Sequence, residues 1–297
     1  MMLNKTVIIY DSVDYFIPFM EGKGVQCYPS FRKIPDKKKV LRKISLMFNC
    51  FPIMWYGEWK SELKNCNTVI VFASKQHDFI KYLCDNYPSV RVIIWYWNPV
   101  AKCFPPHILK RPNLEYWSFD NDDCKTYDLR FNTTFYFDSI RLPRTITNNE
   151  VLFVGADKGR KKYLDIIKEI LTEKKISTNF HIVPDKGHPN PFHIKTIPYS
   201  EYLMKVSQSK VILDYLQKGQ AGQTLRPLEA VFFRKKLITN DKNIIKQPFY
   251  DPQNIFVIDL NDWSDIEEFV KSDYRDISSK LLEYFDFSSW LNRFDIN

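Results

Sequence analysis

One stretch of the chain, residues 211–240, constrains the fold most, because it has the pattern of a strand, a loop, a helix and a second strand in succession. It begins with an apolar run that ends in an acid, residues 211–214, which is typical of a buried parallel strand. Pro227 then stands in the first turn of a predicted helix, which Thr224 can cap. Residues 237–239 predict the next strand. A unit of this kind indicates a parallel sheet with helices packed on it.

The junction between this loop and its helix is suited to an anion. Gly219 and Gly222 allow the loop to approach a phosphate closely, and the backbone N–H groups at a helix N-terminus attract negative charge. Arg226 adds a full positive charge, and Glu229 is placed to reach a pair of sugar hydroxyls beside the phosphates. The stretch therefore predicts a binding site for a phosphate or diphosphate.

This arrangement resembles the donor-binding segment of GT-B glycosyltransferases, particularly the bacterial enzymes that build capsule, exopolysaccharide or lipopolysaccharide. The matching residues are Leu213-Asp214, Gly222-Gln223-Thr224-Leu225-Arg226, Leu228-Glu229-Ala230 and residues 235–240. The resemblance implies a nucleotide-sugar donor, a reaction without a metal ion, and a ribose-binding role for Glu229. Many retaining members carry a second Glu eight residues earlier, where this chain has Ala221. The resemblance therefore decides neither for retention nor for inversion.

The rest of the chain alternates between strand and helix patterns. Strands are predicted at residues 6–10, 67–73, 89–98, 113–119, 134–137, 150–154, 180–183 and 255–259. Alternation of this kind predicts an α/β fold with parallel sheets, and the resemblance implies two Rossmann-like domains that face each other across a cleft. We expect an acceptor-binding domain at residues 1–142, a donor-binding domain at 143–276, and a helix at 277–297 that crosses back to the first domain.

The predicted second domain opens with a strand, a glycine-containing loop and an amphipathic helix. GT-B donor domains open in a similar way, and basic residues of that first loop contact the donor phosphate. The resemblance therefore assigns donor binding to Gly155, Lys158 and Arg160. The alternative is that the two basic side chains are simply solvated in a surface loop.

Two carboxylates follow the first predicted strand. Asp11 and Asp14 stand where ligands collect in an open parallel sheet, beyond the carboxyl ends of its strands. If the enzyme inverts, a general base must accept the proton of the acceptor hydroxyl, and Asp14 and then Asp11 are the candidates. If it retains, no such base is needed. The alternative is that both residues only cap the next helix.

A short acidic run, Asp120-Asn121-Asp122, matches the Asp-x-Asp pattern with which GT-A glycosyltransferases hold a divalent metal. Asp and Asn are also common at helix starts, where they cap the backbone. A metal-dependent GT-A enzyme that uses Asp120 and Asp122 therefore stays an alternative. A sugar-nucleotide-binding protein without catalytic activity is another.

The formal net charge of +8 favours anionic partners. Residues 32–43 hold seven basic residues and one acid, and an apolar and aromatic run follows at residues 44–59. This combination suits peripheral contact with an anionic membrane, although a solvated helix face beside a core segment has the same pattern. No apolar run reaches the roughly 20 residues of a membrane span, and the N-terminus has the pattern of a strand. We therefore expect a cytoplasmic protein, peripheral on the inner membrane face, with no nucleic-acid partner.

Overall fold

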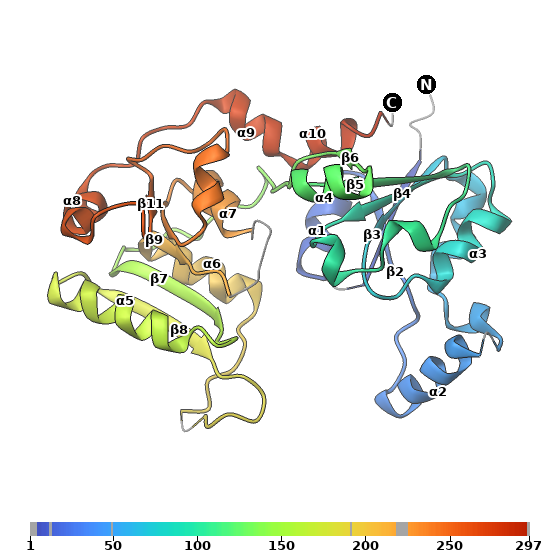
Figure 1. Ribbon diagram of the computed structural model, residues 1–297, viewed down its shortest axis with the longest axis horizontal. Coiled ribbons are helices and arrows are strands. Elements are labelled where there is room, and N and C mark those ends of the chain that lie inside the picture. The colour runs from blue at the N-terminus through green and yellow to red at the C-terminus, as the bar shows by residue number, and fades with distance from the viewer. Residues whose placement is uncertain (1–4, 12–13, 49, 191, 218–224, 296–297) are drawn as a thin grey trace. The chain divides into compact units, whose positions relative to one another are not determined.

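The computed structural model describes residues 5–11, 14–48, 50–190, 192–217 and 225–295. The chain divides into two compact units (Figure 1). Unit 1 comprises Met1–Thr134 and Phe287–Asn297, and unit 2 comprises Phe135–Asp286. Each unit contains a parallel sheet with helices, as the alternating sequence pattern predicts.

Unit 1 holds a six-stranded sheet in the order β2-β1-β3-β4-β5-β6. Its strand pairs are parallel. The strands are β1 (Thr6–Tyr10), β2 (Gln26–Pro29), β3 (Thr68–Phe72), β4 (Arg91–Tyr96), β5 (Leu114–Ser118) and β6 (Arg130–Phe131). The central strands β1 and β3 are buried along their whole length, because their Val, Ile and aromatic residues pack against the layers on both faces.

The helices of unit 1 are α1 (Ile17–Gly22), α2 (Asp36–Met47), α3 (Asp78–Asn86), α4 (Asn121–Tyr127) and α10 (Phe287–Asn292). Short 3-10 helices lie at η1 (Asp14–Phe16), η2 (Pro52–Trp55), η3 (Glu58–Ser61), η4 (Leu63–Asn65), η5 (Val100–Lys102) and η6 (Pro106–Ile108). One core cluster brings Trp59 and Phe79 against the Val and Ile residues of the sheet. Trp290 of α10 packs against Phe72 and Trp95, so the last helix completes the core of unit 1.

Unit 2 holds a five-stranded parallel sheet in the order β11-β10-β9-β7-β8. Its strands are β7 (Asn149–Ala156), β8 (Thr178–Val183), β9 (Ser209–Asp214), β10 (Lys236–Thr239) and β11 (Ile255–Val257). Its helices are α5 (Lys161–Glu173), α6 (Tyr199–Ser207), α7 (Arg226–Phe232), α8 (Ile266–Lys271) and α9 (Ser279–Phe285), with 3-10 helices η7 (Lys242–Lys246) and η8 (Trp263–Asp265). Figure 1 shows α5 running alongside β7 and β8.

Two segments differ from their predicted structure. Residues 134–137 form no sheet strand, because the N–H of Tyr136 donates to the Phe285 carbonyl in an isolated contact outside the sheets. The tail forms two helices, α9 and α10, because the backbone is extended at Asp286. The Asp286 side chain accepts a hydrogen bond from the N–H of Asp138 at 3.0 Å, which holds this break.

Candidate functional site

The strand order of unit 2 places a topological switch point between β7 and β9. After β7 the chain forms β8, which pairs with one edge of β7. It then crosses over and forms β9, which pairs with the other edge of β7. In open α/β sheets, ligands bind beyond the carboxyl ends of the strands at such a point. The carboxyl ends of β7 and β9 are Ala156 and Asp214.

Arg160 lies at this switch point and connects the ends of both strands. Its guanidinium donates to the carbonyl of Ala156 at 2.6 Å and to that of Asp157 at 3.1 Å. A third hydrogen bond runs to the carbonyl of Tyr215, directly after β9. Only 6% of the residue is exposed. Arg160, predicted to contact the donor phosphate, is therefore also part of the local structure of the site.

Arg226, the first residue of α7, reaches the same two strands. It pairs with the buried carboxylate of Asp214 at 3.4 Å and donates to the carbonyl of Val154 in β7. The α7 helix begins here because Pro227 is accommodated in its first turn. The sequence places Arg226 near the helix start, and the fold brings it to the end of the sheet.

Gly155 and Phe153 explain how two arginines fit side by side. A Cβ atom at Gly155 would lie 3.2 Å from Nη2 of Arg160 and 3.3 Å from Nη2 of Arg226. Both guanidinium groups also lie over the ring of Phe153, at 5.2 Å and 5.8 Å from its centroid. The absence of a side chain at Gly155 therefore leaves the space that both guanidinium groups approach.

Several charged side chains surround the two arginines at the switch point. Burial, and then the neighbouring charge of Arg226, lower the pKa of Arg160. For Arg226, burial is the largest single effect and acts against the charge, but Asp214, Tyr202 and Glu229 together outweigh it and the pKa is raised. Arginine stays protonated in proteins. Asp214 is in direct contact with Arg226, and the charges of Asp157 and Asp185 also act on Arg160. Both guanidinium groups lie at the carboxyl ends of β7 and β9, where open α/β sheets bind their ligands.

Glu229 of α7 is almost completely buried, with 4% of the residue exposed. The Tyr202 hydroxyl donates to Oε2 at 2.6 Å and the Tyr199 hydroxyl donates to Oε1 at 3.2 Å. Tyr136 in turn shares a hydrogen bond with Tyr199. Burial raises the pKa of Glu229, while the bond from Tyr202 opposes this rise. Each carboxylate oxygen has two lone pairs, so both retain capacity for a further donor such as a sugar hydroxyl.

Tyr199 and Tyr202 are not among the residues predicted from the sequence. Tyr199 and Tyr202 are spaced i, i+3 on α6, so they share one helix face. That spacing indicates that the two tyrosines lie together. It does not indicate that they bind Glu229, which lies 27 residues after Tyr202 in the chain.

Lys158 lies in the loop between β7 and α5, with its side chain exposed and its backbone in the left-handed region at φ +49°. Its N–H donates to the carboxylate of Asp185 at 3.0 Å, which fixes the loop against the segment after β8. The predicted donor-binding residues Gly222, Gln223 and Thr224 lie outside the described residues.

The two carboxylates predicted for catalysis lie in unit 1. Asp11 is exposed and directly follows β1, whose neighbours in the sheet are β2 and β3. The order of this sheet places its switch point between β1 and β3, so Asp11 stands at the corresponding end of unit 1. Asp14 is the first residue of η1.

The acidic run at the start of α4 has a capping role. Asp120 accepts hydrogen bonds from the N–H groups of Asp122 at 2.9 Å and Asp123 at 3.2 Å. Asp123 accepts one from the N–H of Val100 at 2.8 Å. Within the part of the chain that the structure describes, no group of three or more His, Cys, Asp or Glu residues is arranged to hold a metal ion.

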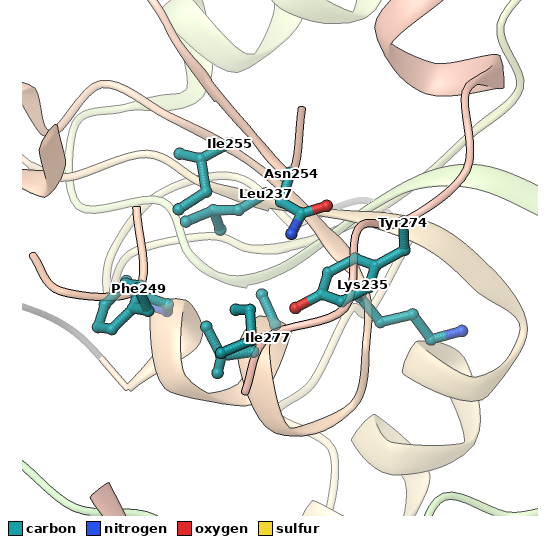
Figure 2. A pocket seen from close by; sticks show the side chains of 10 residues that line it. Lys235, Leu237, Phe249, Asn254, Ile255, Tyr274 and Ile277 are labelled. Carbon is teal, nitrogen blue, oxygen red and sulfur yellow. The ribbon is translucent and has the colours of Figure 1, made fainter. Parts of the chain in front are cut away.

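Unit 2 also contains a small cavity between α7, β10 and the segment that precedes α9 (Figure 2). Its volume is about 10 Å³, which is at the lower limit for a single water molecule. Its lining is mostly apolar and includes Phe249, Ile255 and Ile277. This cavity is a packing space behind α7 and is too small for a nucleotide.

Comparison with solved structures identifies the fold. The DNA-modifying enzyme β-glucosyltransferase, solved in the presence and absence of its substrate uridine diphosphoglucose, matches with a TM-score of 0.52 and 12% identity, over 98% of this chain and 96% of that chain. TarM matches with a TM-score of 0.50 and 13% identity, over 77% of this chain and 54% of TarM. The matched region spans about half the length of TarM.

Both proteins are glycosyltransferases of the GT-B fold. The predicted fold class, an α/β protein with two Rossmann-like domains of the GT-B type, is therefore confirmed. No protein-family model matches the sequence, and neither does any curated protein.

Proposed function

We propose that the chain is a glycosyltransferase that moves a sugar from a nucleotide-sugar donor to a glycan or lipid-linked acceptor, without a metal ion. The observation that carries this proposal is the pair of arginines that lie side by side at the switch point of unit 2, where open α/β sheets bind their ligands. The fold supports it, since a protein with the same fold, the DNA-modifying β-glucosyltransferase, has uridine diphosphoglucose as its substrate.

In this proposal the donor diphosphate lies beyond the ends of β7 and β9. The bond between the anomeric carbon and a phosphate oxygen breaks, a bond from that carbon to the acceptor hydroxyl oxygen forms, and the hydroxyl loses its proton. The leaving diphosphate gains negative charge. Arg226 and Lys158 stabilise that charge, and Arg160 contributes its electrostatic field while its donors hold the backbone. Gly222, Gln223 and Thr224 belong to the same donor site, and Gly155 provides the space for it.

Glu229 binds the ribose of the donor in this proposal. Tyr199 and Tyr202 act as positioning residues, because each holds one oxygen of its carboxylate. An inverting reaction would take its general base from unit 1, where Asp14 and then Asp11 are the candidates at the end of β1. We assign the reaction to bacterial surface polysaccharide synthesis at the cytoplasmic face of the membrane.

A thermal-shift screen of the full chain tests this function. The ligands are UDP, GDP, CMP, dTDP, ADP and their sugars, each with and without EDTA, on the wild type and Glu229→Gln. A ligand that binds only the folded state raises its stability, so we expect one nucleotide class to raise the Tm. The rise should not depend on EDTA and should be smaller in the variant.

Other outcomes of the screen have defined meanings. No Tm change with any nucleotide would contradict the donor site. A rise that disappears with EDTA would favour the metal-dependent alternative at Asp120 and Asp122. Release of free nucleoside diphosphate from the stabilising sugar nucleotide distinguishes an enzyme from a protein that only binds the donor.

A further inference from the structure

The connection from β2 to β3 in unit 1 carries apolar side chains on its surface. Figure 1 shows α2 projecting from the sheet of unit 1. Met47 is 68% exposed, Phe48 is 67% exposed and Phe51 is 82% exposed. The other exposed apolar residues of this connection are Val40, Leu41, Ile44, Ile53 and Met54. We call these eight residues the apolar surface of unit 1.

Three residues of the apolar surface lie on one face of α2. Val40, Ile44 and Met47 follow the i, i+4, i+7 spacing of a single helix face. The opposite side of the helix contacts other residues of unit 1. The Arg42 guanidinium lies 4.9 Å from the centroid of the Phe31 ring, and the Trp55 indole N–H donates to the Ser45 hydroxyl at 2.7 Å. The apolar face is therefore fixed in an outward orientation.

Phe51 extends this surface beyond the helix. Its backbone lies in the left-handed region at φ +48°, which is uncommon for a bulky residue. The next residues form η2, where Ile53 and Met54 are exposed while Trp55 is buried. The exposed phenyl ring of Phe51 thus stands at a turn that leads into η2, and buried Trp55 anchors η2.

Basic residues border this apolar surface. Lys37, Lys38, Lys39 and Lys43 of α2 are exposed, and residues 37–57 contain no acidic residue. Glu58 is the first acidic residue after this stretch, and its carboxylate pairs with Arg32 at 3.1 Å. Apolar side chains that stand between lysines have the pattern with which helices bind the interface of an anionic bilayer.

We infer that this surface docks the protein onto an anionic lipid bilayer, with the apolar side chains inserted at the headgroup boundary. A second copy of this chain fits less well, because a symmetric dimer would bring the same lysines against each other. Nucleic acid would account for the lysines and leave the apolar face unexplained. The inference concerns unit 1 and does not depend on the donor site.

Sedimentation with vesicles tests this inference on the full chain. We expect binding to vesicles of phosphatidylcholine with phosphatidylglycerol, weaker binding at high salt, and none to phosphatidylcholine alone. The apolar variant combines Met47→Ser, Phe48→Ser and Phe51→Ser. The charge variant combines Lys37→Gln, Lys38→Gln and Lys43→Gln. Each should weaken binding by at least about tenfold.

Matched controls use exposed residues of unit 2. Ile146→Ser with Phe192→Ser and Leu260→Ser changes three exposed apolar residues, and Lys168→Gln with Lys174→Gln and Lys280→Gln changes three exposed lysines. Both control variants should bind vesicles like the wild type. Nucleotide-induced Tm shifts, measured on the same variants, should not change, which separates a failure of this inference from a failure of the donor site.

Three results would overturn the inference. The first is no sedimentation with anionic vesicles. The second is a dimer in solution that the apolar variant converts to a monomer, without vesicle binding. The third is salt-sensitive binding to duplex DNA that the charge variant loses and the apolar variant keeps, again without vesicle binding.

Discussion

At the scale of single residues, the buried carboxylate of Glu229 makes stability depend on pH. Burial raises its pKa above the ordinary value of 4.5. Between the pKa of the unfolded chain and that of the folded chain, the folded chain therefore holds more of this proton than the unfolded chain does. As the pH rises from 4.5 through the folded pKa, this residue contributes progressively less to the free energy of unfolding.

Glu229→Gln removes this titration. We predict that the wild type loses stability relative to the variant across that pH window, and that the difference levels off above the folded pKa. Urea denaturation from about pH 4 to about pH 8 measures it. The exposed Glu169→Gln is the control. A difference between wild type and Glu229→Gln that is constant, or that changes with the opposite sign, would contradict the assignment.

Gly155 offers a second test at this scale. Gly155→Ala introduces a Cβ within 3.2–3.3 Å of both arginines, so the guanidinium groups must move. We expect a loss of about 1 kcal/mol in the free energy of unfolding and about tenfold in donor affinity. Gly22→Ala, whose Cβ meets nothing within 4 Å, should leave donor affinity unchanged and should not lower the free energy of unfolding. Equal effects of the two substitutions would refute the role of Gly155.

The sequence could predict only part of this site. Arg226 and Glu229 were candidates from the local pattern of strand, loop and helix, and Gly155, Lys158 and Arg160 were candidates from the resemblance to GT-B donor domains. The contacts among them could not be predicted. The pairing of Arg226 with Val154 spans 72 residues, and the bonds from Tyr199 and Tyr202 to Glu229 depend on how α6 packs beside α7.

At the scale of elements, α10 is a short helix that is fixed by one large side chain. Trp290 is fully buried, with ring centroids 5.4 Å from Trp95 and 4.8 Å from Phe294. We predict that Trp290→Ala lowers the free energy of unfolding by about 3–5 kcal/mol, because it leaves a cavity in the core of unit 1. Chemical denaturation measures the loss. Ile108→Ala, at an exposed position, is the control. A loss for Trp290→Ala that is as small as the loss for the control would contradict the packing of Trp290 in the core.

Apolar runs made most strands predictable, and β1 at residues 6–10 has the predicted bounds. The short edge strands β2 and β6 were missed, because four and two residues give no clear periodicity. The tail was predicted as one helix because its apolar spacing continues through Asp286. The bond from Asp138 that fixes the break there comes from a distant part of the chain.

At the scale of the whole molecule, the net charge of +8 indicates anionic partners without naming them. The structure separates two kinds of basic site. One is the arginine pair of unit 2, in which Arg160 is buried and Arg226 is partly buried, and the other is the exposed lysines beside the apolar surface of unit 1. Among the described residues, no helix has the length and apolar character of a membrane span. The membrane contact that we propose is docking of the apolar surface of unit 1.

The most direct test of the account is calorimetric titration of the full chain, in EDTA, with the nucleoside diphosphate that the screen selects. Lys158→Gln changes an exposed candidate, and Arg226→Lys keeps the charge beside Asp214 while altering its geometry. Lys168→Gln is the matched control on α5. We predict one site, with affinity lowered at least about tenfold by Arg226→Lys, clearly lowered by Lys158→Gln, and unchanged in the control. Equal affinities in all four proteins, or no binding, would contradict a diphosphate site at the switch point of unit 2.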